Sequence, residues 1–256
     1  MAYRYSTAVV TKPSKKVFGT DFEQAQREHD LFVDALRQLD VNILEYDVDE
    51  RRPHAHKVAD VAVIINGTAL MCKPYGGDRQ GEVNLIRQTL KKEMGLTIVE
   101  LNTEHAQLEG SDVLFTGQEI IVGISVYTNE AGAQSVARAF PEYPTTIVTV
   151  EPPLNSLRDA VNMAGVNAIS EVASNSYKVL HLAEPNAANL LYVNGCLIHY
   201  DSDMIPNSTQ IFENKIDYTR YPLSLPTLFK YGVPLYKLAL LSDRVRRQLH
   251  IVSTMP

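Results

Sequence analysis

Two carboxylates in a turn of small residues are the plainest chemical feature of this sequence. The segment Leu108-Glu-Gly-Ser-Asp112 carries Glu109 and Asp112, and the apolar run Val113-Leu-Phe115 follows at once. A carboxylate held at the start of a buried strand can orient a base or bind a cation. The same side chains can instead accept hydrogen bonds from amides of the turn. Both a site role and a turn-forming role are therefore open for this pair.

A second group of charged residues lies earlier in the chain. Asp60 begins the apolar run Val61-Ala-Val-Ile-Ile65, where it can either cap a turn or line a channel. Arg79 follows Asp78 and lies near Glu82 in sequence. It can therefore belong to a surface ion pair, which would stabilise little, or contact a ligand.

His54 and His56 suggest a metal site, because alternate residues of a strand face the same way. A proline precedes the pair, and no third cysteine or histidine ligand lies nearby in sequence. Zinc sites normally use at least three protein ligands. We therefore predict no metal site, and no cofactor is expected for this chain.

The elements that would position these residues recur in a fixed order with a spacing of roughly 50 residues, which is typical of repeated supersecondary units. Thr20-Asp-Phe-Glu23 predicts a capping box that opens a helix ending near Asp40. Further helices are predicted over Val83–Leu90 and Ala131–Phe140, and strands over Val41–Tyr46, Leu96–Leu101 and Thr145–Val150.

Three β-hairpins are predicted between these segments. Asn66-Gly67 and Asn194-Gly195 each lie between apolar runs, and this dipeptide favours the type I′ turn because both of its central residues need positive φ. A third hairpin is predicted around Gly117. The repeated pattern of hairpin, helix and strand indicates ββαβ units arranged in a ring, and residues 1–256 are predicted to form one domain.

Composition excludes several functions. The net charge of −6 argues against nucleic acid as a partner, because phosphate binding needs basic residues clustered on one face. The one basic cluster, Arg244-Val-Arg-Arg247, is short and is interpreted as a solvated helix end. No apolar run reaches the ~18 residues of a membrane span, and the first residues do not resemble a signal peptide. We expect a cytoplasmic protein that binds neither nucleic acid nor membrane. Cys72 and Cys196 are predicted to be free buried thiols, and no cysteine follows Cys196.

Several of these segments together resemble the dimethylarginine dimethylaminohydrolase family, thiol hydrolases that convert methylated arginines to citrulline. The resemblance rests on the Glu109 turn, on the segments 60–74 and 162–165, and extends over most of the chain from Thr7. It implies a five-bladed α/β propeller, known as the pentein fold, built from ββαβ units with the active site in a central channel.

The resemblance also implies that catalytic residues are missing. Glu109 matches the family's acidic residue, which orients a histidine. Ser156 stands at the position of that histidine, and no histidine occurs between His105 and His181. Ser253 is the approximate counterpart of the family's cysteine nucleophile. Only one member of the triad is therefore retained.

The ligand-binding positions are changed as well. Three acidic residues that hold the guanidinium group in the family correspond here to His54, Ala59 and Asp60, of which only Asp60 is acidic. Two arginines hold the carboxylate of the ligand in the family. Arg79 matches one of them, and Tyr127 replaces the other. We expect Asp60 and Arg79 to lie in one concave region.

The sequence thus predicts a dimethylarginine dimethylaminohydrolase-like protein without catalysis, acting as a ligand-binding or protein-interaction module. Its expected partners are a weakly bound guanidino ligand or another protein. The alternative is a hydrolase acting on methylarginine or a related guanidino compound through another nucleophile, for which Ser253, Ser156 and Cys72 are the candidates.

Overall fold

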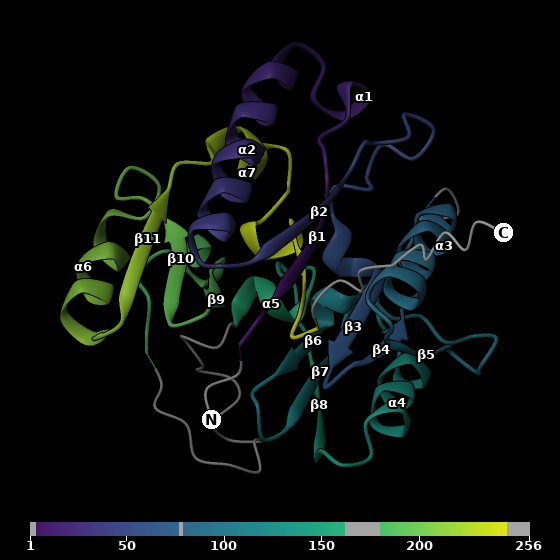
Figure 1. Cartoon of the computed structure of the whole chain (residues 1–256). Helices are drawn as coiled ribbons and strands as arrows, with labels where there is room; N and C mark the ends of the chain where they lie inside the picture. The colour runs from purple at the N-terminus through teal and green to yellow at the C-terminus, as the bar shows by residue number, and fades with distance from the viewer. Residues whose placement is uncertain (1–3, 77–78, 162–179, 245–256) are drawn as a thin grey trace, which may run out of the picture.

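The computed structural model describes residues 4–76, 79–161 and 180–244. Four three-stranded sheets of this part of the chain lie around the middle of the molecule, with helices α3, α4 and α6 on the outside (Figure 1). The strands are β1 (Thr7–Thr11), β2 (Asn42–Tyr46), β3 (Ala62–Ile65), β4 (Thr68–Met71), β5 (Thr97–Val99), β6 (Val113–Phe115), β7 (Ile120–Ile124), β8 (Thr145–Thr149), β9 (Leu191–Val193), β10 (Cys196–Tyr200), β11 (Thr219–Leu223) and β12 (Leu240–Ser242).

The four sheets share one topology. In each, the central strand pairs antiparallel with one neighbour and parallel with the strand that follows a helix, as in β3-β4-β5 and β6-β7-β8. The helices are α1 (Lys15–Phe18), α2 (Phe22–Gln38), α3 (Gln80–Gln88), α4 (Glu130–Ala139), α5 (Leu157–Ala160), α6 (Pro206–Lys215) and α7 (Pro226–Lys230). The predicted ββαβ units are confirmed, and four of them lie in the described residues.

The first unit is completed by the C-terminal part of the described chain. Strand β12 pairs antiparallel with β1, with Ala8 opposite Leu241, while β2 pairs parallel with β1 on its other side. A sheet built from both ends of a chain closes a ring of repeated units. This is the arrangement expected of an α/β propeller.

The predicted hairpins are present. Asn66 and Gly67 have φ of 47° and 78°, and Asn194 and Gly195 have φ of 50° and 86°. Gly117, between β6 and β7, has φ of 90°. These positive values confirm that the local turn residues set the strand pairing.

The predicted helices and strands are confirmed with shifted ends, but the predicted capping box is wrong. The helix α2 continues from a 3-10 turn, η1 (Gly19–Asp21), and its N-cap residue Asp21 makes no side-chain capping bond. The Asp21 carboxylate accepts hydrogen bonds from Lys230 and Tyr231 instead. A contact with α7 has therefore replaced the local cap.

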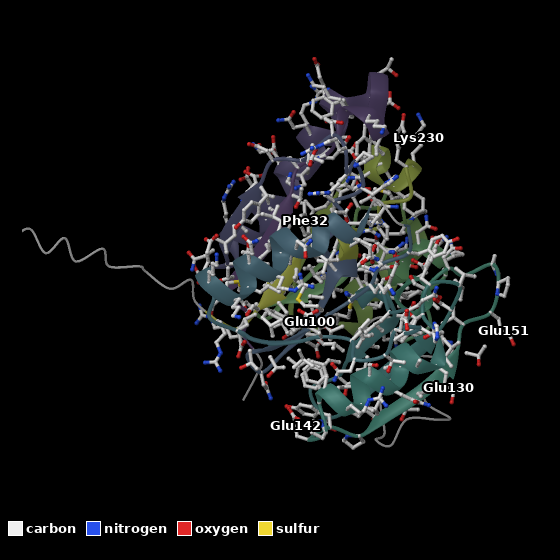
Figure 2. The ribbon with its side chains drawn as sticks, turned by 90° about the vertical axis from the view of Figure 1, so that its right-hand side faces the viewer. Phe32, Glu100, Glu130, Glu142, Glu151 and Lys230 are labelled. Carbon is white, nitrogen blue, oxygen red and sulfur yellow. The ribbon has the colours of Figure 1, made fainter. Side chains whose placement is uncertain are left out.

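The apolar core is divided among the units. The largest cluster packs α2 against the sheets that contain β1 and β10, and includes the fully buried Phe32 (Figure 2). Further clusters lie at the sheets that contain β4 and β7. Where the units meet, several buried side chains are charged instead.

No helix in the described part of the chain is both long and apolar enough to cross a membrane.

Candidate functional site

Short 3-10 turns bring the charged residues to the meeting point of the units. Turn η2 (Val58–Val61) precedes β3, η5 (Gly110–Asp112) precedes β6, and η7 (Leu235–Lys237) precedes β12. The turn η2 contacts both η5 and η7. Because equivalent places in three units converge, residues far apart in sequence form one cluster.

A glycine allows two of these turns to approach. A Cβ atom added at Gly110 would lie 2.0 Å from the backbone oxygen of Ala59, a distance that no packed structure tolerates. Ala59 itself is buried. The contact between η2 and η5 therefore requires glycine at position 110 and holds Asp60 and Glu109 close to each other.

Arg79 is surrounded by acceptors from the protein itself. Its Nη1 donates to Asp60 Oδ2 at 3.0 Å and its Nε to Glu82 Oε2 at 3.1 Å, while Nη2 donates to the backbone oxygen of Lys57 at 3.2 Å. Glu109 Oε1 lies 3.6 Å from Nη1. The side chain is 8% exposed, so the predicted surface ion pair is in fact a buried one. Arg79 and Asp60 do lie in one region, where they bind each other.

Lys237 is the second buried cation, and the sequence reasoning missed it. Its Nζ lies 3.2 Å from Asp60 Oδ1 and 3.7 Å from Glu109 Oε2. It also lies 6.0 Å from the centre of the Tyr127 ring. The sequence did contain a signal for it, because Lys237 is the one charged residue in the apolar run 233–241. A charged side chain in a segment that is buried on folding must be paired with an opposite charge.

The cations and carboxylates shift one another's protonation. Burial favours the neutral form of Asp60, but Lys237 and Arg79 outweigh this effect and lower its pKa. Burial and the charge of Asp60 raise the pKa of Glu109, against Lys237 and Arg79. Burial opposes the charge of Lys237, yet Asp60 and Glu109 raise its pKa. Asp60, Arg79 and Lys237 are therefore charged at neutral pH.

Asp112 has the turn-forming role that the sequence left open. Its Oδ2 accepts hydrogen bonds from Ser125 and Thr128, both at 2.6 Å, and its Oδ1 accepts the Leu157 amide at 2.9 Å. Burial nevertheless raises the pKa of Asp112. These contacts fix η5 to the segment between β7 and α4 and to the start of α5.

Ser156 is fully buried at the N-cap position of α5. Its Oγ lies 3.0 Å from the hydroxyl of Tyr236, which donates to Asp159 Oδ1 at 2.6 Å. The guanidinium of Arg158 lies over the Tyr236 ring at 4.6 Å. Ser156 is thus connected to the cluster through the residue that precedes Lys237.

Of the remaining predicted site residues, one lies beside the cluster, one lies beside another histidine and one is outside the described residues. His54 is half-buried, with its ring 6.2 Å from that of His56, and the strand expected there is a series of turns. Tyr127 is half-buried with its ring 5.9 Å from that of Tyr75. Ser253 lies outside the described residues. The structure therefore groups Asp60, Arg79, Glu109 and Tyr127 around Lys237.

The two thiols are free and buried, as predicted. Burial raises the pKa of Cys72 well above its ordinary value, and the charges of Asp60 and Glu109 add to the effect. Burial also raises the pKa of Cys196. Because the thiolate is the nucleophilic form, neither cysteine is activated.

Known proteins resemble both the sequence and the structure. A model of the eukaryotic N,N dimethylarginine dimethylhydrolase family matches residues 8–158. DDAH2 of Homo sapiens is 35% identical over 243 residues, covering 86% of this chain and 85% of the relative. The N(G),N(G)-dimethylarginine dimethylaminohydrolase of Pseudomonas aeruginosa is 26% identical over 116 residues, 45% of each chain.

Solved structures share the fold at lower identity. A mutant of the dimethylarginine dimethylaminohydrolase of Pseudomonas aeruginosa, complexed with citrulline, has a TM-score of 0.82 at 18% identity, covering 94% of this chain and 100% of that chain. The N-terminal domain of the cyanobacterial arginine dihydrolase ArgZ has a TM-score of 0.75 at 13% identity, covering 92% and 97%. The fold is the α/β propeller that the repeats indicated, and the chain belongs to the dimethylarginine dimethylaminohydrolase family.

Proposed function

We propose that this chain is a non-catalytic member of its family that acts as a ligand-binding or protein-interaction module. The buried ion cluster is the observation that supports this most directly. Arg79 and Lys237 bind Asp60 and Glu109 within hydrogen-bonding or ion-pair distance. In this proposal, the protein's own cations take the place of a guanidino ligand.

The position of Lys237 supports the loss of the nucleophile. In the family triad, nucleophile, histidine and orienting acid must be close to one another for proton transfer. Lys237 lies 3.7 Å from Glu109, the retained acid, and enters from the C-terminal part of the described chain. In this proposal Lys237 holds the retained acid in an ion pair, while Ser253, the predicted counterpart of the cysteine, lies outside the described residues. A lysine is nucleophilic when its pKa is lowered, whereas the pKa of Lys237 is raised.

The contacts of Ser156 support the loss of the base. Its hydroxyl is bound to Tyr236, and the Tyr236 hydroxyl is bound to Asp159. Burial and the charge of Asp159 raise the pKa of Tyr236 well above its ordinary value. Neither hydroxyl can accept a proton near neutral pH as an imidazole does. The alternative of a Cys72-dependent hydrolase is disfavoured by its raised pKa.

An exposed aromatic surface beside the cluster favours a protein partner. Tyr75 is 64% exposed and Val126 62% exposed, and the Tyr75 ring packs on Tyr127, whose ring faces Lys237. Exposed tyrosines are common in protein interfaces. The two reduced thiols are typical of a cytoplasmic protein, and we include that location in the proposal.

The test is an assay of the purified chain with asymmetric dimethylarginine, arginine and agmatine in parallel. The ureido product of each, citrulline for the first two, is measured beside the Pseudomonas aeruginosa enzyme as positive control. We expect no product above background and, by calorimetry, no binding of these compounds tighter than ~1 mM, or about −4 kcal/mol. Citrulline formation at about 1 per second or faster would disprove the proposal. A slower rate abolished by Ser156→Ala, Ser253→Ala or Cys72→Ala would favour the alternative enzyme.

A further inference from the structure

A buried histidine outside the ion cluster has no hydrogen-bond partner among the described residues. His29, on the face of α2 that packs on β2, is 0% exposed. Within the described part of the chain, neither its Nδ1 nor its Nε2 has a hydrogen-bond partner. An unsatisfied buried polar group is unfavourable, so a ligand for this imidazole would stabilise the fold.

Two carboxylates lie next to the same imidazole. Nδ1 of His29 lies 3.8 Å from Asp30 Oδ1 and 3.9 Å from Glu45 Oε1, which is too long for hydrogen bonds. One ligand atom of each residue lies within 4.8 Å of those of the other two. Ligand atoms in a tetrahedral zinc site, with bonds of about 2.0–2.2 Å, lie roughly 3.3–3.6 Å apart. The two distances from His29 need to shorten by only a few tenths of an ångström. The distance between the two carboxylates needs to shorten by at most about 1.5 Å, which rotation of the exposed Asp30 side chain can supply.

The charges and exposures at this place also suit a cation. Asp30 and Glu45 supply two negative charges, with side chains 58% and 26% exposed. The neighbouring cation Lys12 is bound to a different carboxylate, Asp47, at 2.8 Å. A cation bound here would neutralise the two carboxylates that lie beside the buried imidazole.

We propose that His29, Asp30 and Glu45 bind one divalent transition-metal ion, for which zinc is the best match. One imidazole nitrogen and two carboxylate oxygens are ligands that zinc accepts, and water can supply the fourth position from the exposed Asp30 side. The site joins α2 to β2. It is independent of the ion cluster and of the proposed function.

His56 provides a matched comparison. It too is 0% exposed, and in the part of the chain that the structure describes its two ring nitrogens have no hydrogen-bond partner. Its ring packs against Phe18 at 5.3 Å, and among the described residues it is not part of a group of metal-ligating side chains. A buried histidine alone therefore does not make this site.

The experiment is zinc binding to the full chain after removal of metal by chelator. Stoichiometry is measured by equilibrium dialysis with elemental analysis, and the ligand set by the visible spectrum of the Co²⁺-substituted protein. Binding is compared among the natural chain, His29→Leu, Glu45→Gln and Asp30→Asn. The controls are His56→Leu, Glu23→Gln on the exposed face of α2, and Cys72→Ala with Cys196→Ala.

We expect one zinc ion per chain, a spectrum of nitrogen and oxygen ligands, and a rise in Tm on zinc addition. Glu45→Gln and Asp30→Asn, which leave the helix core intact, should each weaken binding at least tenfold, and the controls should bind as the natural chain does. Absence of bound zinc, or equal affinity of Glu45→Gln and the natural chain, would overturn the proposal. So would loss of binding in His56→Leu or in the cysteine variant, because the metal would then lie elsewhere.

Discussion

Lys237 and Arg79 decide the chemistry at the centre of this protein. Both are almost fully buried, and each contacts Asp60 and Glu109. Burying ions is costly, so such a cluster adds little net stability compared with apolar residues of the same shape. Removal of one partner is different, because it leaves the opposite charge buried without compensation. The cluster is therefore sensitive to single substitutions.

Replacing Lys237 with methionine should destabilise the fold by about 3–5 kcal/mol, the usual effect of removing one partner of a buried ion pair. Denaturant unfolding of both proteins measures the difference. The matched control is Lys230→Met, because Lys230 pairs with Asp21 at 2.8 Å on the surface, where pairs contribute about 0–1 kcal/mol. Figure 2 shows Lys230 at the outer end of the molecule, opposite Glu142. Equal effects of the two substitutions would refute this account of the cluster.

At the scale of elements, the site depends on three 3-10 turns at equivalent places in three units. Each turn carries its charged residue just before the first strand of its unit, as η2, η5 and η7 do with Asp60, Asp112 and Lys237. The turns hold these side chains only if they pack closely. The placement of the carboxylates is therefore a property of turn packing more than of any single helix or strand.

Gly110→Ala should destabilise the protein by about 3 kcal/mol or more, because its Cβ would lie 2.0 Å from a backbone oxygen. Thermal and denaturant unfolding test this. Gly117→Ala is the control, since its Cβ would meet no atom within 4 Å and its cost comes from a positive φ, roughly 1–2 kcal/mol. A Gly110→Ala protein as stable as Gly117→Ala would show that the close approach of η2 and η5 does not require glycine at position 110.

His56, which packs on Phe18 of α1, should make the stability of the fold depend on pH. Burial is the main cause that lowers its pKa to about 3, and repulsion by the charge of Lys57 adds to this effect. Because the folded pKa lies below the unfolded value near 6.5, its contribution is complete above pH 6.5 and is lost as the pH falls towards 3. Between pH 6.5 and 4.5, the free energy of unfolding of the natural chain should fall by up to ~2.7 kcal/mol more than that of His56→Leu. Unfolding at several pH values measures this.

The exposed His105 gives the control for that experiment. His105→Leu removes an exposed histidine instead. If the pH dependence of unfolding is the same in His56→Leu as in His105→Leu, the His56 imidazole is not buried in its neutral form.

At the scale of the whole molecule, the ββαβ ring brings residues of several units to one place. The central cluster combines Asp60 and Arg79 of one unit, Glu109 of the next, and Lys237 from beside the strand that closes the ring. A substitution at one position therefore leaves the side chains that the other units contribute in place. Restoring a catalytic function would require compatible changes in several units.

Ser156→His combined with Ser253→Cys should not produce citrulline from asymmetric dimethylarginine, because Lys237 still binds the carboxylates and His54 and Ala59 still replace acidic residues. If any activity appears, it should appear first in Ser156→His combined with Lys237→Cys. That pair removes the cation that binds Asp60 and Glu109 and adds a thiol at the same position of the chain. A citrulline assay of both double variants decides the matter. Efficient turnover by the first pair would show that the ligand pocket is intact.

Much of the fold was determined by short stretches of sequence. Asn66-Gly67 and Asn194-Gly195 predicted their hairpins correctly because positive φ is a local requirement that few residue pairs meet. The strand predicted over Val41–Tyr46 and the helix predicted over Ala131–Phe140 are both present, with ends shifted by one residue. The resemblance to the family, read from motifs around Asp60 and Glu109, was confirmed by the family model and by human DDAH2.

Only the tertiary structure decided which charges meet. Asp60 and Lys237 are 177 residues apart, and no local pattern indicates that two turns so distant will pack together. The same is true in part of Arg79. Its contact with Glu82 was open from the sequence, whereas its contact with Asp60, 19 residues away, was decided by the tertiary structure. A turn is set by the conformational preferences of a few residues, whereas a buried ion cluster is set by the packing of whole units and by the need to pair every charge that the packing removes from water.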